Sequence, residues 1–177
     1  MRTAALLIGL TLALAGSASA VTSPPKLNEV ATSVTGQPAQ VRCWSETEWD
    51  ELVFAPREAA GFVLAGVPEI NLSPNVCEPL LLAMRGQGDD WNVAYGVLTL
   101  AHEIEHVRGV EDEAEANCRA LATARLVARL LGMRPGRATN VRNAARFQWH
   151  SHPDAYRKPG CPWASPAPAW MRDATGG

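Results

Sequence analysis

The chain has 177 residues, of which 16 are Lys or Arg and 18 are Asp or Glu, so its formal net charge is −2. This length suits one domain with a modest hydrophobic core. A nearly balanced charge without a strong basic field argues against a nucleic-acid-binding protein, and we expect no nucleic-acid partner.

The first 20 residues have the organisation of an export signal. Arg2 supplies a positive charge, residues 4–15 are apolar, and residues 18–20 (Ala-Ser-Ala) form a small-residue cleavage site. The apolar run is too short to span a membrane comfortably. We therefore expect cleavage near Ala20 and a secreted or extracytoplasmic mature chain that is monomeric and not stably inserted in a membrane.

The next two segments predict a flexible lead-in and then regular structure. Thr, Ser, Pro and Gly are frequent in residues 21–40, which is typical of a flexible segment. Residues 41–60 indicate a short strand followed by a helix that begins near Ser45. Glu48, three positions later, would complete a capping box at the start of this helix.

Two further strands and a helix are expected before the central motif. Residues 61–72 indicate two short strands around a Gly-Val-Pro turn. The second of them, residues 68–72, could pair with an extended substrate backbone. Ser73 and Pro74 are suited to opening a helix over residues 75–85.

The segment at residues 98–117, LTLAHEIEHVRGVEDEAEAN, is predicted to begin inside a buried helix. A largely apolar stretch precedes its histidines. Asp89 or Asp90 can cap the start of the helix, and Gly109 can end it.

This helix carries the pattern HExxH, formed by His102, Glu103 and His106. Residues four apart lie on one helix face, so the two imidazoles can bind one ion. Glu103 is rotated by about 100° and can reach a water molecule on that ion. Two neutral imidazoles and a carboxylate base are typical of a zinc hydrolase, with Glu103 as the general base.

A second long helix is predicted over residues 111–131, where apolar residues recur at three- and four-residue steps. Its first turn is acidic, with Glu111, Asp112, Glu113 and Glu115. Carboxylates at this end are stabilised by the helix dipole. However, zinc held by two histidines also needs a third ligand, which a carboxylate just after a Gly turn can supply.

The third ligand is assigned by resemblance. The residues Glu113-Ala114-Glu115-Ala116-Asn117 resemble the ExxA-Asp/Asn pattern of gluzincin-type metallopeptidases, whose second helix carries a glutamate ligand. This resemblance implies a zinc site of His102, His106 and Glu113, although only six residues separate His106 from Glu113. The pattern HExxHxxGxxD, which ends at Asp112, is also similar to small metzincin-like secreted proteases with an aspartate ligand. Asp112 is therefore the alternative to Glu113.

The C-terminal part is less informative. Residues 137–149 indicate a short basic helix. Tyr156, or a histidine such as His152, could donate a hydrogen bond to a tetrahedral oxyanion, a role that such peptidases fill from beyond the second helix. Residues 161–177 are rich in Pro and Ala and are expected to form an extended tail.

The chain has four cysteines, at positions 43, 77, 118 and 161. An even number in an exported chain predicts two disulfides, for which three pairings are possible. We favour Cys43–Cys77 and Cys118–Cys161, which tie the front and back halves separately, but the pairing stays open at this stage.

We therefore expect an α+β fold, a minimal zincin-like domain over residues 41–160 that is mainly helical with a small sheet. The expected function is an exported zinc-dependent hydrolase, a metallopeptidase that cleaves a peptide or protein substrate with zinc-activated water. Two other classes stay open: a non-catalytic secreted zinc-binding module, and a secreted structural or interaction protein with a fortuitous motif. The presence of Glu103 argues against the first, because a purely structural site does not use a base.

Overall fold

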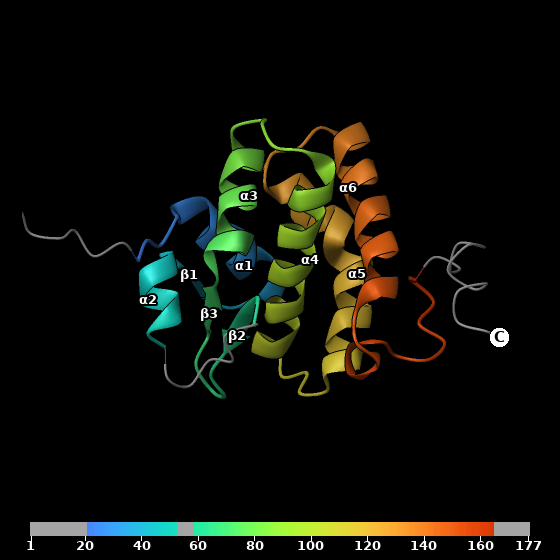
Figure 1. The fold of residues 1–177 in the computed structure, drawn as a ribbon, viewed down its shortest axis with the longest axis horizontal. Helices are drawn as coiled ribbons and strands as arrows, with labels where there is room; N and C mark the ends of the chain where they lie inside the picture. Colours follow the sequence, from blue (N-terminus) through green and yellow to red (C-terminus); the bar gives the residue numbers. More distant parts are fainter. Residues whose placement is uncertain (1–20, 53–58, 165–177) are drawn as a thin grey trace, which may run out of the picture.

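The structure is a computed structural model that describes residues 21–52 and 59–164. The expected export signal and residues 165–177 of the expected tail lie outside these residues. The described chain is mainly helical with one three-stranded sheet, which confirms the α+β class (Figure 1). In chain order the elements are α1 (Pro25–Thr35), β1 (Gln40–Cys43), α2 (Glu46–Asp50), β2 (Gly61–Val63), β3 (Glu69–Leu72), α3 (Pro74–Met84), α4 (Asp90–Val107), α5 (Glu113–Leu130), α6 (Pro135–Gln148) and the 3-10 turns η1 (Trp149–Ser151) and η2 (Asp154–Tyr156).

The segment over residues 21–40 is part of the domain and not a flexible lead-in, so this expectation was wrong. It forms α1, whose apolar face is fully buried through Leu27, Val30 and Ala31. Thr22 forms an antiparallel bridge with Cys43, which ties the segment to β1. The many Thr, Ser and Pro residues obscured a helical spacing of these three apolar side chains.

The sheet has the order β1-β3-β2, with β1 parallel and β2 antiparallel to β3. Ile70 of β3 pairs with Val41 on one side and with Val63 on the other. Because both edges of β3 are occupied, the expectation that residues 68–72 pair with a substrate was wrong. Among the described residues, β2 has no strand on its outer side, so it is the open edge.

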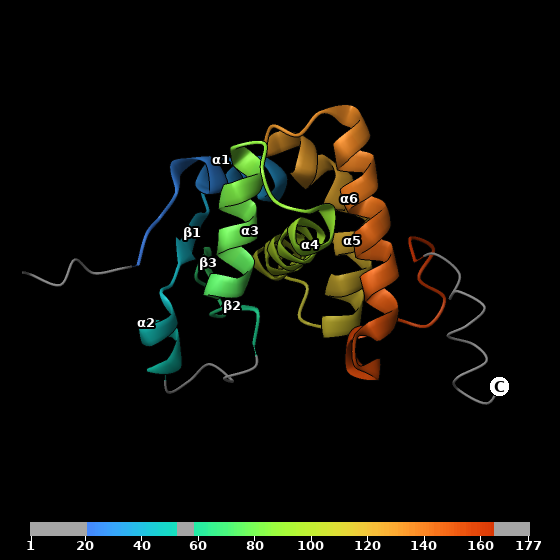
Figure 2. The same ribbon diagram turned by 45° about the horizontal axis from the view of Figure 1, so that its top comes forward.

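Helix α4 is the centre of the domain. It packs against α3, α5 and α6, and its C-terminal half also contacts β2 and β3. Figure 2, which looks nearly along α4, shows α3 and the sheet on one side and α5 and α6 on the other. Gly96 permits the close contact with α3, because a Cβ atom there would lie 3.0 Å from the carbonyl oxygen of Val76. This central position explains why polar side chains in the second half of α4 are buried.

The turn between α4 and α5 brings the ends of these two helices together. Asp89 caps the start of α4 by accepting hydrogen bonds from the N–H groups of Trp91 and Asn92. At the other end the chain reverses at Gly109, whose φ of 87° favours glycine. After this turn α5 begins beside the end of α4.

Two disulfides cross-link the domain, in the pairing that we favoured from the sequence. Cys43 of β1 is joined to Cys77 of α3, and Cys118 of α5 is joined to Cys161. Such bonds are compatible with an extracellular protein. Within the described residues, no helix has the length and apolar character needed to span a membrane.

Candidate metal centre

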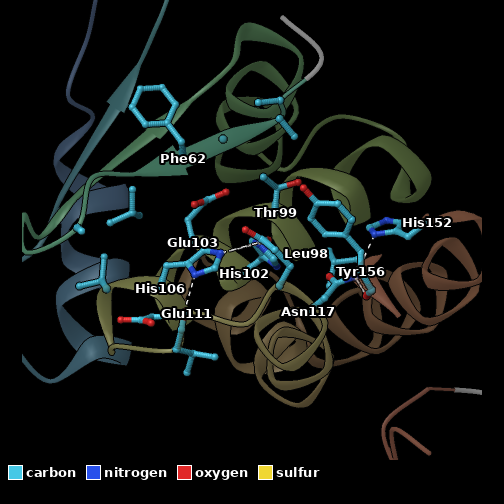
Figure 3. A pocket seen from close by; sticks show the side chains of 18 of the residues that line it. Phe62, Leu98, Thr99, His102, Glu103, His106, Glu111, Asn117, His152 and Tyr156 are labelled. Carbon is cyan, nitrogen blue, oxygen red and sulfur yellow. Dashed lines mark hydrogen bonds and ion pairs between the residues drawn. The ribbon is translucent and has the colours of Figure 1, made fainter. Parts of the chain in front are cut away.

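Three side chains from α4 and α5 converge at the turn between these helices. Nε2 of His102 lies 2.9 Å from Oε2 of Glu113 and 2.9 Å from Nε2 of His106. Nε2 of His106 lies 3.4 Å from the same Glu113 oxygen. Figure 3 shows the two imidazoles side by side on α4, at the floor of a pocket. His102 is nearly buried, whereas His106 and Glu113 are partly exposed.

The hydrogen bonding of His106 leaves its Nε2 atom available to bind a metal ion. Its Nδ1 lies 2.6 Å from the carbonyl oxygen of Val110, to which it must donate. In the neutral imidazole, Nε2 then carries a lone pair and faces Nε2 of His102. Histidine ligands of metals commonly donate their other N–H to a backbone carbonyl in this way.

The chemistry and spacing of these donors fit a metal ion. The three ligand atoms all lie within 4.8 Å of one another. A tetrahedral ion with bonds of about 2.05 Å would hold its ligand atoms about 3.3 Å apart, close to the separations observed here. His102, His106 and Glu113 therefore form a group that could hold a metal ion.

The alternative ligand Asp112 has a different position. It is the N-cap of α5, and its Oδ1 accepts a hydrogen bond of 2.7 Å from the backbone N–H of Glu115. Hydrogen bonding from His102 holds the pKa of Glu113 below its usual value. The structure thus brings Glu113, and not Asp112, to the two histidines.

Glu103 lies beside this group in a strongly buried position. Its side chain points from α4 toward β2 (Figure 3), and the residue is only 4% exposed. Burial, and secondarily the charge of Glu113, raises its pKa to about 8. Its Oε2 is buried and has no hydrogen-bond partner. A buried carboxylate oxygen is normally hydrogen-bonded, so this atom lacks a partner that such atoms usually have.

The pocket over His102, His106 and Glu113 is large enough for a polymer segment, with a volume of about 1030 Å³. One wall is β2 with the following turn, and the opposite wall is the segment around η1 and η2. The floor is α4 with the start of α5. Its walls are mainly apolar, and they surround a small number of polar groups.

Both expected oxyanion residues line this pocket. The ring of Tyr156 lies 6.0 Å from that of His102. Burial lowers the pKa of His152, whereas burial raises that of Tyr156. His152 is therefore a pocket residue and not a free surface histidine.

Asn117 connects these residues to α5. It is almost fully buried, and its amide nitrogen donates 3.0 Å to Nδ1 of His152 and 2.9 Å to the carbonyl of Tyr156. Because Nδ1 of His152 accepts, the hydrogen of the neutral ring is on Nε2. Asn117 therefore fixes both the orientation and the tautomer of His152.

Neither Asn117 nor Gly61 was among the site residues expected from the sequence. Asn117 lies four positions after Glu113, on the same helix face, and this spacing could have indicated a role near the metal ligands. No sequence pattern indicates a role for Gly61, because that role depends on how β2 packs against α4.

Comparison of the chain with protein-family models, with curated proteins and with solved structures gives no match.

Proposed function

We propose that this chain is an exported zinc-dependent metallopeptidase with a minimal zincin-like fold. One observation carries the proposal. The group of His102, His106 and Glu113 adjoins a buried carboxylate, Glu103, and all four residues line one large pocket. A purely structural metal site would need neither this carboxylate nor this pocket.

Zinc is the metal that this donor set favours. Two imidazoles and one carboxylate are a common catalytic zinc set, and they leave a coordination position open. Bound here, zinc would supply a Lewis acid that activates water and polarises a carbonyl group. The resemblance to gluzincins supports the same ligands.

Glu103 would act as the general base and then as the general acid. Its carboxylate would take a proton from the attacking water and pass it to the leaving amine. Its buried position supports this role, because a carboxylate without hydrogen-bond partners is a stronger base than a solvated one.

His152 and Tyr156 would stabilise the negative charge that develops on the carbonyl oxygen. The Nε2–H of His152 is left free by the bond from Asn117, and the hydroxyl of Tyr156 is a second donor. Donors held in place before the reaction are effective at such oxygens.

The open edge of β2 supports a peptide as the substrate. In an antiparallel ladder, every second residue of a strand is hydrogen-bonded to the neighbouring strand. The N–H of Ser73 donates to the carbonyl of Ala60, so Phe62 is the next residue that is hydrogen-bonded to β3. Gly61 and Val63 then direct their N–H and C=O groups toward the open edge. An extended peptide could pair with these groups while its scissile bond lies over the metal site.

The test is metal analysis of the purified chain from residue 21, followed by assays on unfolded proteins. We expect about one zinc per chain, and the substitution Glu103→Gln should retain the zinc but lower turnover by a factor of roughly 10² or more. Glu105→Gln, in the same helix but outside the pocket lining, is the matched control.

Each alternative function has its own result in this experiment. A secreted structural protein with a fortuitous motif would bind no zinc. A non-catalytic zinc module would bind zinc but cleave no peptide, and Glu103→Gln would then leave every measured property unchanged.

A further inference from the structure

The net charge of the whole chain is nearly neutral, but one segment is strongly basic, so the expectation that the chain lacks a strong basic field was wrong for this segment. Residues 119–158 contain nine Lys or Arg residues and one acidic residue, Asp154, which leaves 7 basic and 17 acidic residues in the rest of the chain. This segment forms most of α5, all of α6 and the two 3-10 turns. The basic charge is therefore concentrated on one part of the fold.

Four of these basic residues form salt bridges with three carboxylates. Arg119 and Lys158 bind Glu115, Arg137 binds Asp90, and Arg157 binds Asp154. The other five are arginines, and no carboxylate of the described residues forms a salt bridge with them: Arg125, Arg129, Arg134, Arg142 and Arg146.

On α5, two of the five lie one turn apart on the outer side. Glu113 marks the inner side of this helix, which faces α4. Arg125 and Arg129 are exposed and lie well away from that side, since each residue rotates by about 100°. Arg129 donates to the carbonyl of Met133, in the turn that leads to α6.

On α6, two more lie one turn apart on the flank nearer α5. The flank nearer the start of α4 carries Arg137, which binds Asp90, and Phe147, which contacts Trp91. Arg142 and Arg146 are on the opposite flank of the helix. Helices α5 and α6 pack side by side (Figures 1 and 2), so from the helix periodicity we infer that these two arginines lie on the same side of the helix pair as Arg125 and Arg129. We call these four residues the arginine face.

Within the arginine face, Arg142 and Arg146 are close enough for their charges to disfavour each other. Burial, and secondarily the charge of Arg142, lowers the pKa of Arg146. Nε of Arg146 is buried and has no hydrogen-bond partner. Like charges brought together without a counter-charge repel, and a bound anion would remove this repulsion.

We propose that the arginine face docks the protein on the surface of a membrane rich in anionic phospholipids. Guanidinium groups bind phosphate groups well, and basic residues near such a surface are attracted to it. Leu126, three positions before Arg129 and so its neighbour on the surface of α5, is 50% exposed and can enter the headgroup region. This contact is peripheral and requires no spanning helix.

The position of the arginine face keeps the pocket accessible. None of the four arginines lines the pocket, so the pocket stays open when the face is covered. This docking does not depend on the proposed catalytic function.

The experiment is co-sedimentation of the purified chain from residue 21 with vesicles. We expect binding to phosphatidylcholine vesicles that contain 30% phosphatidylglycerol, weak binding to pure phosphatidylcholine, and release as salt is raised. Each arginine should contribute roughly fivefold, so Arg142→Gln with Arg146→Gln should weaken binding about 30-fold. The same should hold for Arg125→Gln with Arg129→Gln.

Matched controls separate docking from folding and from total charge. The pair Lys26→Gln and Arg85→Gln removes two charges elsewhere and should change binding little. The pair Arg142→Lys and Arg146→Lys keeps the charge and should keep most of the binding. Equal binding to both vesicle types, full binding of either Arg→Gln pair, or binding to duplex DNA but not to vesicles would each overturn the proposal.

Discussion

Gly61 of the edge strand β2 lies directly against Glu103 of α4. A Cβ atom built on Gly61 would be 2.9 Å from Oε1 of Glu103 and 3.0 Å from the carbonyl oxygen of Asn71. No side chain other than hydrogen fits there without a shift of the strand or of the carboxylate. The missing side chain at Gly61 lets β2 lie close to the proposed base and to the group of His102, His106 and Glu113.

The substitution Gly61→Ala should therefore lower kcat while zinc stays bound. The new methyl group must displace Glu103 or β2, and small displacements of a catalytic group are costly. Peptide turnover and zinc content of the purified variant are the measurements. Gly136→Ala in α6, where a Cβ atom meets nothing within 4 Å, is the control and should keep full activity. An unchanged kcat in Gly61→Ala would show that this contact does not position the base.

The choice of third ligand can be tested with two neighbouring substitutions. Glu113→Ala removes a ligand atom and should weaken zinc binding by orders of magnitude in a competitive chelator titration. Asp112→Ala removes only the cap of α5, which should lower the free energy of unfolding by about 1 kcal/mol and change zinc affinity little. The reverse ranking of zinc affinities would assign the site to the aspartate type.

The parts of the site that could be predicted from the sequence are those set by helix periodicity. His102, Glu103 and His106 are placed by one helix, and their spacing alone fixes their relative directions. Glu113 required a resemblance, because the turn at Gly109 decides which carboxylate returns to the histidines. Gly61 could not be predicted, since its contact with Glu103 depends on how the sheet packs against α4.

The same distinction applies to the fold. The long helices α4, α5 and α6 were expected at nearly their observed positions. For α5 the expectation rested on recurring apolar residues, and for α4 on an apolar stretch between a capping Asp and Gly109. The order of the strands depends on long-range pairing, for which local sequence carries little information. This is why the central strand β3, and not β2, was expected to meet the substrate.

Asn117 is expected to be a positioning residue for His152. Asn117→Asp keeps the shape but replaces the donating amide with an acceptor, which would move the hydrogen of His152 from Nε2 to Nδ1. We expect a lower kcat with nearly unchanged KM and zinc content, and a changed pH profile. Asn143→Asp on the exposed side of α6 is the control. Equal kinetics for the two variants would leave Asn117 with only a structural role.

The open edge of β2 can be tested with a proline. Val63 directs its N–H away from β3, so Val63→Pro should remove one donor at the edge and leave the pairing with β3 intact. We expect kcat/KM to fall for long peptides and to change little for short substrates that do not reach β2. A uniform loss for substrates of every length would indicate a damaged site instead of a lost strand pairing.

The two disulfides should differ in their effect on activity but not on stability. Their sequence separations, 34 and 43 residues, are similar, so replacing either pair by serine should lower the free energy of unfolding by about 2–4 kcal/mol in denaturant titrations.

Cys118 directly follows Asn117, and its bond to Cys161 closes the segment that contains His152 and Tyr156. Loss of this bond loosens the wall of the pocket, whereas Cys43 and Cys77 lie outside the pocket lining. Both double variants should be assayed at a temperature where they are folded and at equal zinc content. Cys118→Ser with Cys161→Ser should then lose more peptide turnover than Cys43→Ser with Cys77→Ser. Equal losses of turnover would mean that the segment after α6 takes no part in the reaction.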